Sequence, residues 1–179
     1  MMIVVTGGSG SGKSEYAETL AAGLGEGRRI YIATMRPFDE ECRRRIERHR
    51  AMREGKRFET AECYTGLKNL ILSGRPSVLL ECMSNLTANE MYEKNGAGEN
   101  TVSEILGGIE SIKRQAENVV VVTNEVFSDG ITYDLETERY LKYLGIINQR
   151  LGEMADCIVE SVCSIPVYYK GEEPCLLRV

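Results

Sequence analysis

The chain has 179 residues, of which 42% are hydrophobic and 27% are charged, and its net charge is −5. This length and balance suit a single globular domain over residues 1–179 with a substantial core, and they exclude a disordered chain. No apolar stretch approaches the roughly 20 residues that a membrane span needs, and no charged segment precedes an apolar one as in a secretory signal. We therefore expect a cytoplasmic protein without a membrane span.

Short apolar runs alternate with segments of helical periodicity, which is typical of a mostly parallel sheet flanked by helices in three layers. The predicted strands cover residues 2–6, 29–34, 77–82, 119–123 and 157–162. The predicted helices cover residues 13–24, 39–53, 66–72, 86–94, 102–117 and 135–154. Residues 101–104 predict a capping box. Residues 95–100 and 127–133 are predicted loops, the second with Asp129-Gly130 as its turn signal.

The run GGSGSGKS follows the first predicted strand and fits the phosphate-binding loop pattern G-x-x-x-x-G-K-[S/T]. Its glycines let backbone N–H groups point toward an anion, and the start of the next helix adds a partial positive charge. We expect Lys13 to reach the β- and γ-phosphates and Ser14 to bind Mg²⁺. A Gly/Ser-rich turn that binds nothing is the alternative. The predicted phosphate contacts are Gly7, Gly8, Ser9, Gly10, Ser11, Gly12, Lys13 and Ser14.

With this loop at a strand–helix junction, the predicted fold class is an α/β fold like that of P-loop NTPases, of the RecA-like type. In open parallel sheets, ligands bind beyond the carboxyl ends of the strands. Glu81 closes the apolar run at residues 78–80 and could bind Mg²⁺ directly or through water, or it could cap a neighbouring helix. Asn124 and Glu125 follow a later strand, where contact with nucleotide or acceptor and a structural role are equally open.

Positive charge is concentrated in one stretch of this acidic chain. Residues 43–57 contain eight Arg or Lys side chains and two Glu side chains. The pattern favours a single polyanion site over general binding of nucleic acid, because the rest of the chain is acidic and no aromatic residues interleave with the arginines. A solvated basic helix face is the alternative.

The only histidine of the chain, His49, lies in this basic stretch. On a helix it shares a face with Cys42 and Ile46, so we expect it to point toward the body of the protein. Neighbouring arginines favour the neutral imidazole, whose free lone pair makes it a plausible nucleophile toward phosphorus. A partly buried structural histidine is the alternative.

Six cysteines are scattered along the chain without a C-x-x-C pair, which argues against a zinc site or a disulfide-stapled secreted domain. Reduced thiols are expected in a cytoplasmic protein. The six are Cys42, Cys63, Cys82, Cys157, Cys163 and Cys175.

Several stretches together resemble one family over residues 1 to about 160. They read MMIVVTGGSGSGKSEYAE, YIAT, RIERHR, FETAE, LLECMSNL, VVTNEV and INQRLGEMAD. The family is the bifunctional adenosylcobinamide kinase / adenosylcobinamide-phosphate guanylyltransferase of cobalamin biosynthesis. The phosphate loop is shared by many NTPases, whereas its combination with R-I-x-x-H and V-T-N-E-V is far more specific.

The resemblance implies two reactions, with ATP and GTP as substrates and Mg²⁺ as the metal. A triphosphate phosphorylates the hydroxyl of adenosylcobinamide, and GTP then donates GMP through a histidine, which here is His49, to give adenosylcobinamide-GDP and pyrophosphate. It also implies a homo-oligomer, a trimer in relatives, and no nucleic-acid partner. Beyond the phosphate loop, the nucleotide or metal contacts that it implies are Ala33, Thr34, Met35, Arg50, Ala51, Met52, Arg53, Glu62 and Glu81.

The chain departs from the family pattern in places. Gly10 stands where relatives often have arginine, and residues 126–132 lack the proline of the family's V-G-x-G-I-V-P stretch. The arginine–aspartate pair before INQ is replaced near Leu141-Lys142, and residues 171–179 match no family feature. These differences fall where an acceptor or a neighbouring subunit would make contact.

Three other functions fit parts of this pattern. A phosphate-loop kinase for another small alcohol would retain normal activity after His49→Ala. A nucleotide-binding regulatory module would bind nucleotide without an acceptor-dependent reaction. An ATPase that binds nucleic acid through the basic helix would show steeply salt-dependent affinity.

Overall fold

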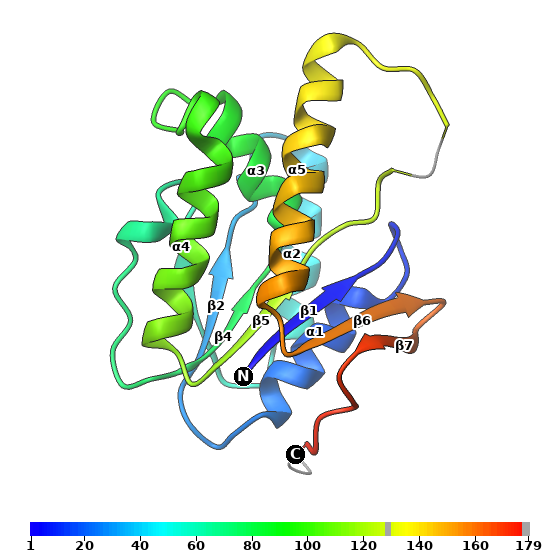
Figure 1. The fold of residues 1–179 in the computed structure, drawn as a ribbon. Helices are drawn as coiled ribbons and strands as arrows, with labels where there is room; N and C mark the ends of the chain where they lie inside the picture. Colours follow the sequence, from blue (N-terminus) through cyan, green and yellow to red (C-terminus); the bar gives the residue numbers. More distant parts are fainter. Residues whose placement is uncertain (128–129, 177–179) are drawn as a thin grey trace.

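The computed structural model describes residues 1–127 and 130–176, without the side chain of Met52 (Figure 1). Its sheet has the strand order β3-β2-β4-β5-β1-β6-β7. All neighbouring strands are parallel except β6 and β7, which are antiparallel. The strands are β1 (Met2–Thr6), β2 (Arg29–Ala33), β3 (Phe58–Glu62), β4 (Ser77–Leu80), β5 (Asn118–Val122), β6 (Cys157–Val162) and β7 (Ile165–Lys170).

Helices cover both faces of the sheet, so the predicted three-layer α/β arrangement is confirmed. Helices α3, α4 and α5 lie on one face, and α1 and α2 lie on the other (Figure 1). The α-helices are α1 (Lys13–Gly23), α2 (Glu40–Met52), α3 (Met83–Tyr92), α4 (Thr101–Gln115) and α5 (Leu135–Met154). In the described part of the chain, no helix is both long and apolar enough to cross a membrane.

The side chains of β1 show how the two faces form. Met2 and Val4 pack in the core beneath α3, α4 and α5, whereas Ile3 and Val5 pack in the core beneath α1. Successive residues of a strand point to opposite faces, and a strand buried on both faces reads as a continuous apolar run. This is why the central strands of this sheet could be predicted from short apolar runs.

All five predicted strands exist, but the sheet has two further edge strands that we did not predict. β3 has the sequence FETAE and is largely exposed, so its charged residues hide the strand signal. β7 has the sequence IPVYYK and pairs only with β6. An edge strand buries one face at most, and therefore its sequence is less apolar than that of a central strand.

Three helical predictions need correction. Residues 66–72 form only the short 3₁₀ turn η1 (Leu67–Asn69), because Gly66 has a left-handed backbone and Leu70 is extended. Helix α3 begins at Met83, earlier than predicted. The capping box is wrong, because the Thr101 hydroxyl donates to the Gly98 carbonyl at 2.6 Å within the turn that follows η2 (Gly98–Asn100). The predicted turn at Asp129 lies outside the described residues.

The topology brings the candidate site residues to one edge of the sheet. β1, β2, β4 and β5 run parallel, so the segments that follow them leave from the same edge. The phosphate loop follows β1, Thr34 follows β2 and Glu81 follows β4.

Candidate active site

The phosphate loop forms between β1 and α1 with the predicted strand–loop–helix arrangement. Gly7, Gly10 and Gly12 have φ angles of 149°, 73° and 87°, which other residues rarely adopt. The Lys13 ammonium donates to the Gly8 carbonyl at 2.9 Å, so this side chain folds back over the loop. Burial lowers the pKa of Lys13, since an ammonium loses solvation there. A phosphate anion would restore the lost solvation.

Glu81 is buried at the end of β4, where it joins this strand to β2. Its carboxylate accepts a hydrogen bond from the Thr34 N–H at 3.2 Å. The Thr34 hydroxyl in turn donates to the Cys82 carbonyl at 2.9 Å. Helix α3 begins after Cys82 without a side-chain cap, so Glu81 serves the strand ends and does not cap that helix.

Helix α2, which carries the basic stretch, is held to the body largely by polar contacts at its carboxyl end. The Arg53 guanidinium lies 3.4 Å from the centroid of the Tyr31 ring. The Lys56 ammonium donates to the Glu18 carboxylate of α1 at 3.0 Å, and Glu18 is only 1% exposed. No side chain described for α2 itself is fully buried. The Arg29 guanidinium also donates to the Lys56 carbonyl at 3.2 Å, so a cation stacked on a ring, one ion pair and this hydrogen bond hold the carboxyl end of the helix.

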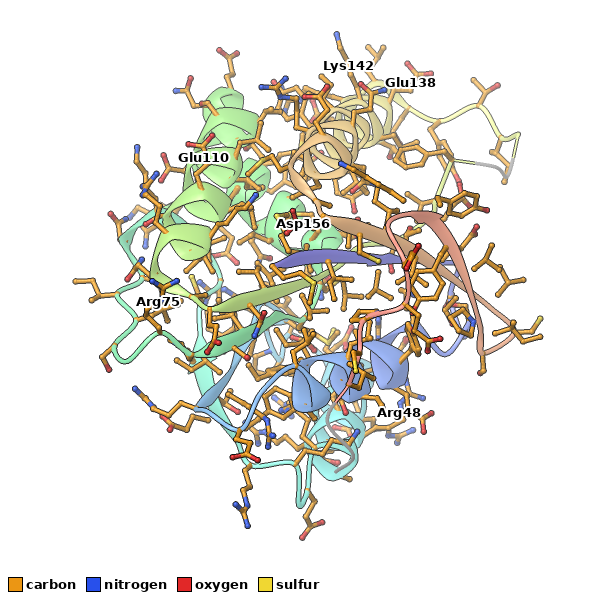
Figure 2. The ribbon with its side chains drawn as sticks, turned by 60° about the horizontal axis from the view of Figure 1, so that its bottom comes forward. Arg48, Arg75, Glu110, Glu138, Lys142 and Asp156 are labelled. Atoms are coloured by element: carbon orange, nitrogen blue, oxygen red, sulfur yellow. The ribbon has the colours of Figure 1, made fainter. Side chains whose placement is uncertain are left out.

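Two cavities meet at His49. The first, of about 270 Å³, lies between α2 and the ends of β2, β3 and β4. The second, of about 620 Å³, lies between α2 and the phosphate loop and is lined by Arg44, Arg45 and Arg48. Figure 2 shows Arg48 in the layer opposite Glu110 and Lys142. Of the described residues, His49 is the one that lines both cavities. We call them the first cavity and the phosphate-loop cavity.

His49 is half-buried and shares the less exposed face of α2 with Cys42 and Ile46, as predicted. Burial lowers its pKa, the nearby Glu81 carboxylate opposes this effect, and Arg53, Arg48 and Arg45 add to it. The neutral imidazole is therefore favoured at neutral pH. Its Nδ1 atom is buried and has no hydrogen-bond partner among the described residues. The neutral imidazole retains a lone pair, which a nucleophile requires.

The Glu62 carboxylate lies on the wall of the first cavity that the end of β3 forms. The Tyr64 hydroxyl donates to Glu62 at 2.9 Å, and the Tyr64 ring lies 4.4 Å from the Arg36 guanidinium carbon. Asn89 donates to the carbonyls of Thr34 and Tyr64 at 2.9 and 3.0 Å, so it ties the segment after β2 to the segment after β3. This contact fixes two walls of the first cavity relative to each other.

The structure brings most of the predicted nucleotide contacts together. Six of them line the first cavity with His49: Ala33, Met35, Arg50, Arg53, Glu62 and Glu81. Another six line the phosphate-loop cavity: Ser9, Gly10, Ser11, Gly12, Lys13 and Ser14. Gly7 and Gly8 complete the loop behind them.

Three predicted contacts lie differently. Thr34 is fully buried, with its hydroxyl turned to Cys82. Ala51 is exposed and lines only a shallow hollow beside Arg50 and Arg53. The side chain of Met52 lies outside the described part of the structure.

Sequence reasoning missed several residues that shape the site. Tyr31, Thr60 and Tyr64 line the first cavity. Tyr31 lies in the middle of an apolar strand, where its ring reads as ordinary core, and only its partner Arg53 reveals a further role. Thr60 and Tyr64 depend on strand β3, which was not predicted. The polar residues of FETAE stand at positions 59, 60 and 62, so this segment lacks the strict alternation that would have predicted a strand.

The fold and the site together define a phosphate-loop nucleotide-binding protein. A solved structure described as a prototypical ATPase from the type III secretion system of pathogenic bacteria shares the fold, with a TM-score of 0.56 and 12% sequence identity. The similarity covers 89% of this chain and 50% of that chain. At this identity the comparison shows the fold alone.

Sequence comparison identifies the family. The profile of the family described as cobinamide kinase / cobinamide phosphate guanyltransferase matches residues 3–168, and the chain belongs to this family of transferases. Two similar relatives are the bifunctional adenosylcobalamin biosynthesis proteins CobU of Salmonella typhimurium strain LT2, 36% identical, and of Escherichia coli strain K12, 34% identical. Each match covers 95% of this chain and 100% of the relative. The resemblance seen in the sequence motifs is thereby confirmed.

Proposed function

We propose that this chain phosphorylates adenosylcobinamide and then transfers GMP from GTP to the product, and that His49 carries the GMP between substrates. The observation that carries the histidine assignment is the place of His49 where the first cavity meets the phosphate-loop cavity. A triphosphate bound in the phosphate loop, with its nucleoside in the first cavity, would pass its α-phosphate beside the imidazole. Nucleophilic attack requires this proximity.

The guanylyl transfer occurs in two displacements. A neutral nitrogen of His49 attacks the α-phosphorus of GTP, an N–P bond forms, and the bond to the bridging oxygen breaks to release pyrophosphate. A phosphate oxygen of adenosylcobinamide phosphate then attacks the same phosphorus. The N–P bond breaks, the imidazole is regenerated, and adenosylcobinamide-GDP is formed. Imidazole suits both steps because it is a good nucleophile and a good leaving group.

Arginines of α2 support the first displacement. Arg44, Arg45 and Arg48 line the phosphate-loop cavity, where the β- and γ-phosphates would lie. Guanidinium groups bind phosphate oxygens through paired, charge-assisted hydrogen bonds. They therefore stabilise the charge that develops on the departing pyrophosphate, and Arg45 and Arg48 also favour the neutral form of His49.

The kinase step uses the same loop with ATP or GTP as the donor. The cobinamide hydroxyl attacks the γ-phosphorus and gives up its proton to water, and the bond to the bridging oxygen of the diphosphate breaks. Phosphoryl transfer depends mainly on positioning and on neutralising phosphate charge. Lys13 and the loop N–H groups supply both, while His49 is not required.

The donor set also fits Mg²⁺. Ser14 and Glu81 line one small gap beside His49 and Tyr31. Mg²⁺ commonly binds one or two protein oxygens and completes its shell with water and phosphate, so a hydroxyl and one carboxylate suffice. Bound there, the ion would neutralise charge on the β- and γ-phosphates. In the described residues no group of three or more His, Cys, Asp or Glu could hold a metal by itself.

We further propose a single cytoplasmic domain that assembles as a homo-oligomer, a trimer by analogy with the family. Exposed apolar residues on one side of β7, Ile165 and Val167, support an interface between copies. The free thiols of all six cysteines suit a reducing compartment. The partners are nucleotides and the corrinoid, and no nucleic acid is expected.

Transfer of label from α-phosphate-labelled GTP tests the histidine assignment. With Mg²⁺, the wild-type chain should retain label after denaturation, lose it in acid, and pass it to adenosylcobinamide phosphate. His49→Ala should take up no label and should still phosphorylate adenosylcobinamide. If the wild type binds GTP without taking up label, the covalent step is refuted. If His49→Ala retains both activities, the histidine is structural.

A further inference from the structure

The turn between β6 and β7 packs directly against the phosphate loop. Cys163 and Ser164 form this turn with φ angles of 51° and 65°, a left-handed pair typical of tight hairpins. A Cβ atom added to Gly7 would lie 2.7 Å from the Ser161 carbonyl oxygen, and one added to Gly12 would overlap the Ser164 hydroxyl. Two of the loop glycines are therefore needed for the close approach of this turn.

Two hydrogen bonds connect the turn to one carbonyl of the loop. The Ser161 hydroxyl donates to the Ser11 carbonyl at 2.6 Å, and the Ser164 N–H donates to the same oxygen at 2.9 Å. Ser161 is 2% exposed, so water does not compete for its hydroxyl. A carbonyl oxygen has two lone pairs, and this pair of donors uses both.

Fixing the Ser11 carbonyl also fixes the direction of the Gly12 N–H. The peptide unit between Ser11 and Gly12 is planar, and in a trans peptide the C=O and N–H bonds point in opposite directions. Two donors that hold the Ser11 oxygen toward the hairpin therefore turn the Gly12 N–H away from it. Ser11, Gly12 and Lys13 line the phosphate-loop cavity on that other side.

We propose that Ser161 and Ser164 are positioning residues that orient the Gly12 N–H toward the phosphates of the bound nucleotide. The proposal rests on the proposed function only in that the loop binds a polyphosphate. If the Gly12 N–H already points toward the phosphates before the nucleotide binds, it loses no conformational freedom on binding. This orientation therefore increases the affinity for the nucleotide. Because the kinase and the transfer reactions share the loop, both depend on this contact.

Ser161→Ala removes one of the two donors and tests the proposal. Calorimetric titration with inorganic pyrophosphate in the presence of Mg²⁺ should give a Kd about 5- to 10-fold above that of the wild type, the loss expected for one hydrogen bond. In the kinase reaction, KM for the triphosphate should rise by a similar factor, with kcat nearly unchanged. Ser161→Thr, which retains the hydroxyl, should restore the affinity.

Tyr169→Phe is the matched control. The Tyr169 hydroxyl belongs to the same hairpin and donates to Glu160 at 2.7 Å, on an exposed surface. This variant loses a hydroxyl and a hydrogen bond without touching the loop, so its pyrophosphate Kd should equal that of the wild type. The proposal is overturned if Ser161→Ala and Tyr169→Phe bind pyrophosphate equally well.

A measurement on the unmodified chain covers the case in which Ser161→Ala does not fold. Saturation with pyrophosphate should slow hydrogen exchange at the Ser164 amide, because coupling between the two contacts is reciprocal. Unchanged exchange would overturn the proposal. Failure of the histidine assignment is distinguishable, since it would abolish label transfer in the wild type and leave pyrophosphate binding intact.

Discussion

The phosphate loop and helix α2 face each other across one cavity, yet they are held in different ways. The loop is held between β1 and α1 and braced by the β6–β7 turn through backbone and buried hydroxyl contacts. Helix α2 has no fully buried side chain among those described, and its carboxyl end is tied through Arg53 and Lys56. The conformation of the phosphate loop is thus fixed by backbone and buried hydroxyl contacts, whereas the position of His49 depends on a few long polar side chains.

This comparison predicts that the phosphate loop serves both reactions, whereas His49 serves only the guanylyl transfer. Lys13→Ala should reduce both the kinase and the transfer rates by about 10²–10³-fold, the usual effect of losing one charge-stabilising group. His49→Ala should abolish only the transfer. Steady-state assays of each reaction with both variants test this separation. If Lys13→Ala impairs only one reaction, the two do not share the loop.

The packing of the phosphate loop against the β6–β7 turn can be disrupted at Gly12. Gly12→Ala should lower the free energy of unfolding by about 2–4 kcal/mol, because a left-handed alanine is strained and its Cβ overlaps Ser164. Gly10→Ala is the control, since its φ is also positive, 73°, but nothing lies within 4 Å of its added Cβ. It should lose only about 1–2 kcal/mol. Equal losses in urea unfolding would contradict the close packing of the turn.

The polar attachment of α2 can be broken at Lys56. Lys56→Met leaves the buried Glu18 unpaired and should lower the free energy of unfolding by about 1–3 kcal/mol, less than for a fully buried pair because the Lys56 side chain is 27% exposed. Guanylyl transfer should fall more than pyrophosphate affinity. Arg28→Met, which removes the exposed ion pair with Glu59 and the contacts of Arg28 with Ser73, should change the free energy of unfolding less than Lys56→Met. Similar effects of both variants would show that α2 is not held by this contact.

The smallest expected effect is on pH dependence. Transfer needs neutral His49, so its rate falls as pH drops through the His49 pKa. Burial and the surrounding arginines lower this pKa, so the acid limb should lie below the ordinary histidine value of about 6.5. Arg48→Gln removes one of these cations and should move the limb to higher pH. Lys142→Gln removes a charge from the opposite layer (Figure 2) and should leave the pH–rate profile in place.

Central strands and the loop were predictable because their signals are local. A continuous apolar run predicts a strand buried on both faces, and glycines followed by Lys13 and Ser14 predict a phosphate loop at its end. The face of His49 followed from helical periodicity, which needs only the neighbours on the same helix. Strand β3 was missed because its pattern is that of an exposed edge strand. Residues 66–72 were predicted helical from their local pattern, which the structure overrides with a left-handed Gly66 and an extended Leu70.

By itself, then, the sequence determined the α/β class, the phosphate loop, the basic helix with His49, and, through its combined motifs, the family. Only the tertiary structure decided that Ser161 contacts Ser11 across 150 positions and that Arg53 stacks on Tyr31. These contacts join segments that are far apart in the sequence, and the local pattern of one segment does not predict its contact with the other. They arise when the sheet order places β6 beside β1 and when α2 returns to the face covered by α1, because hydrogen bonds and stacking act only at short range in space.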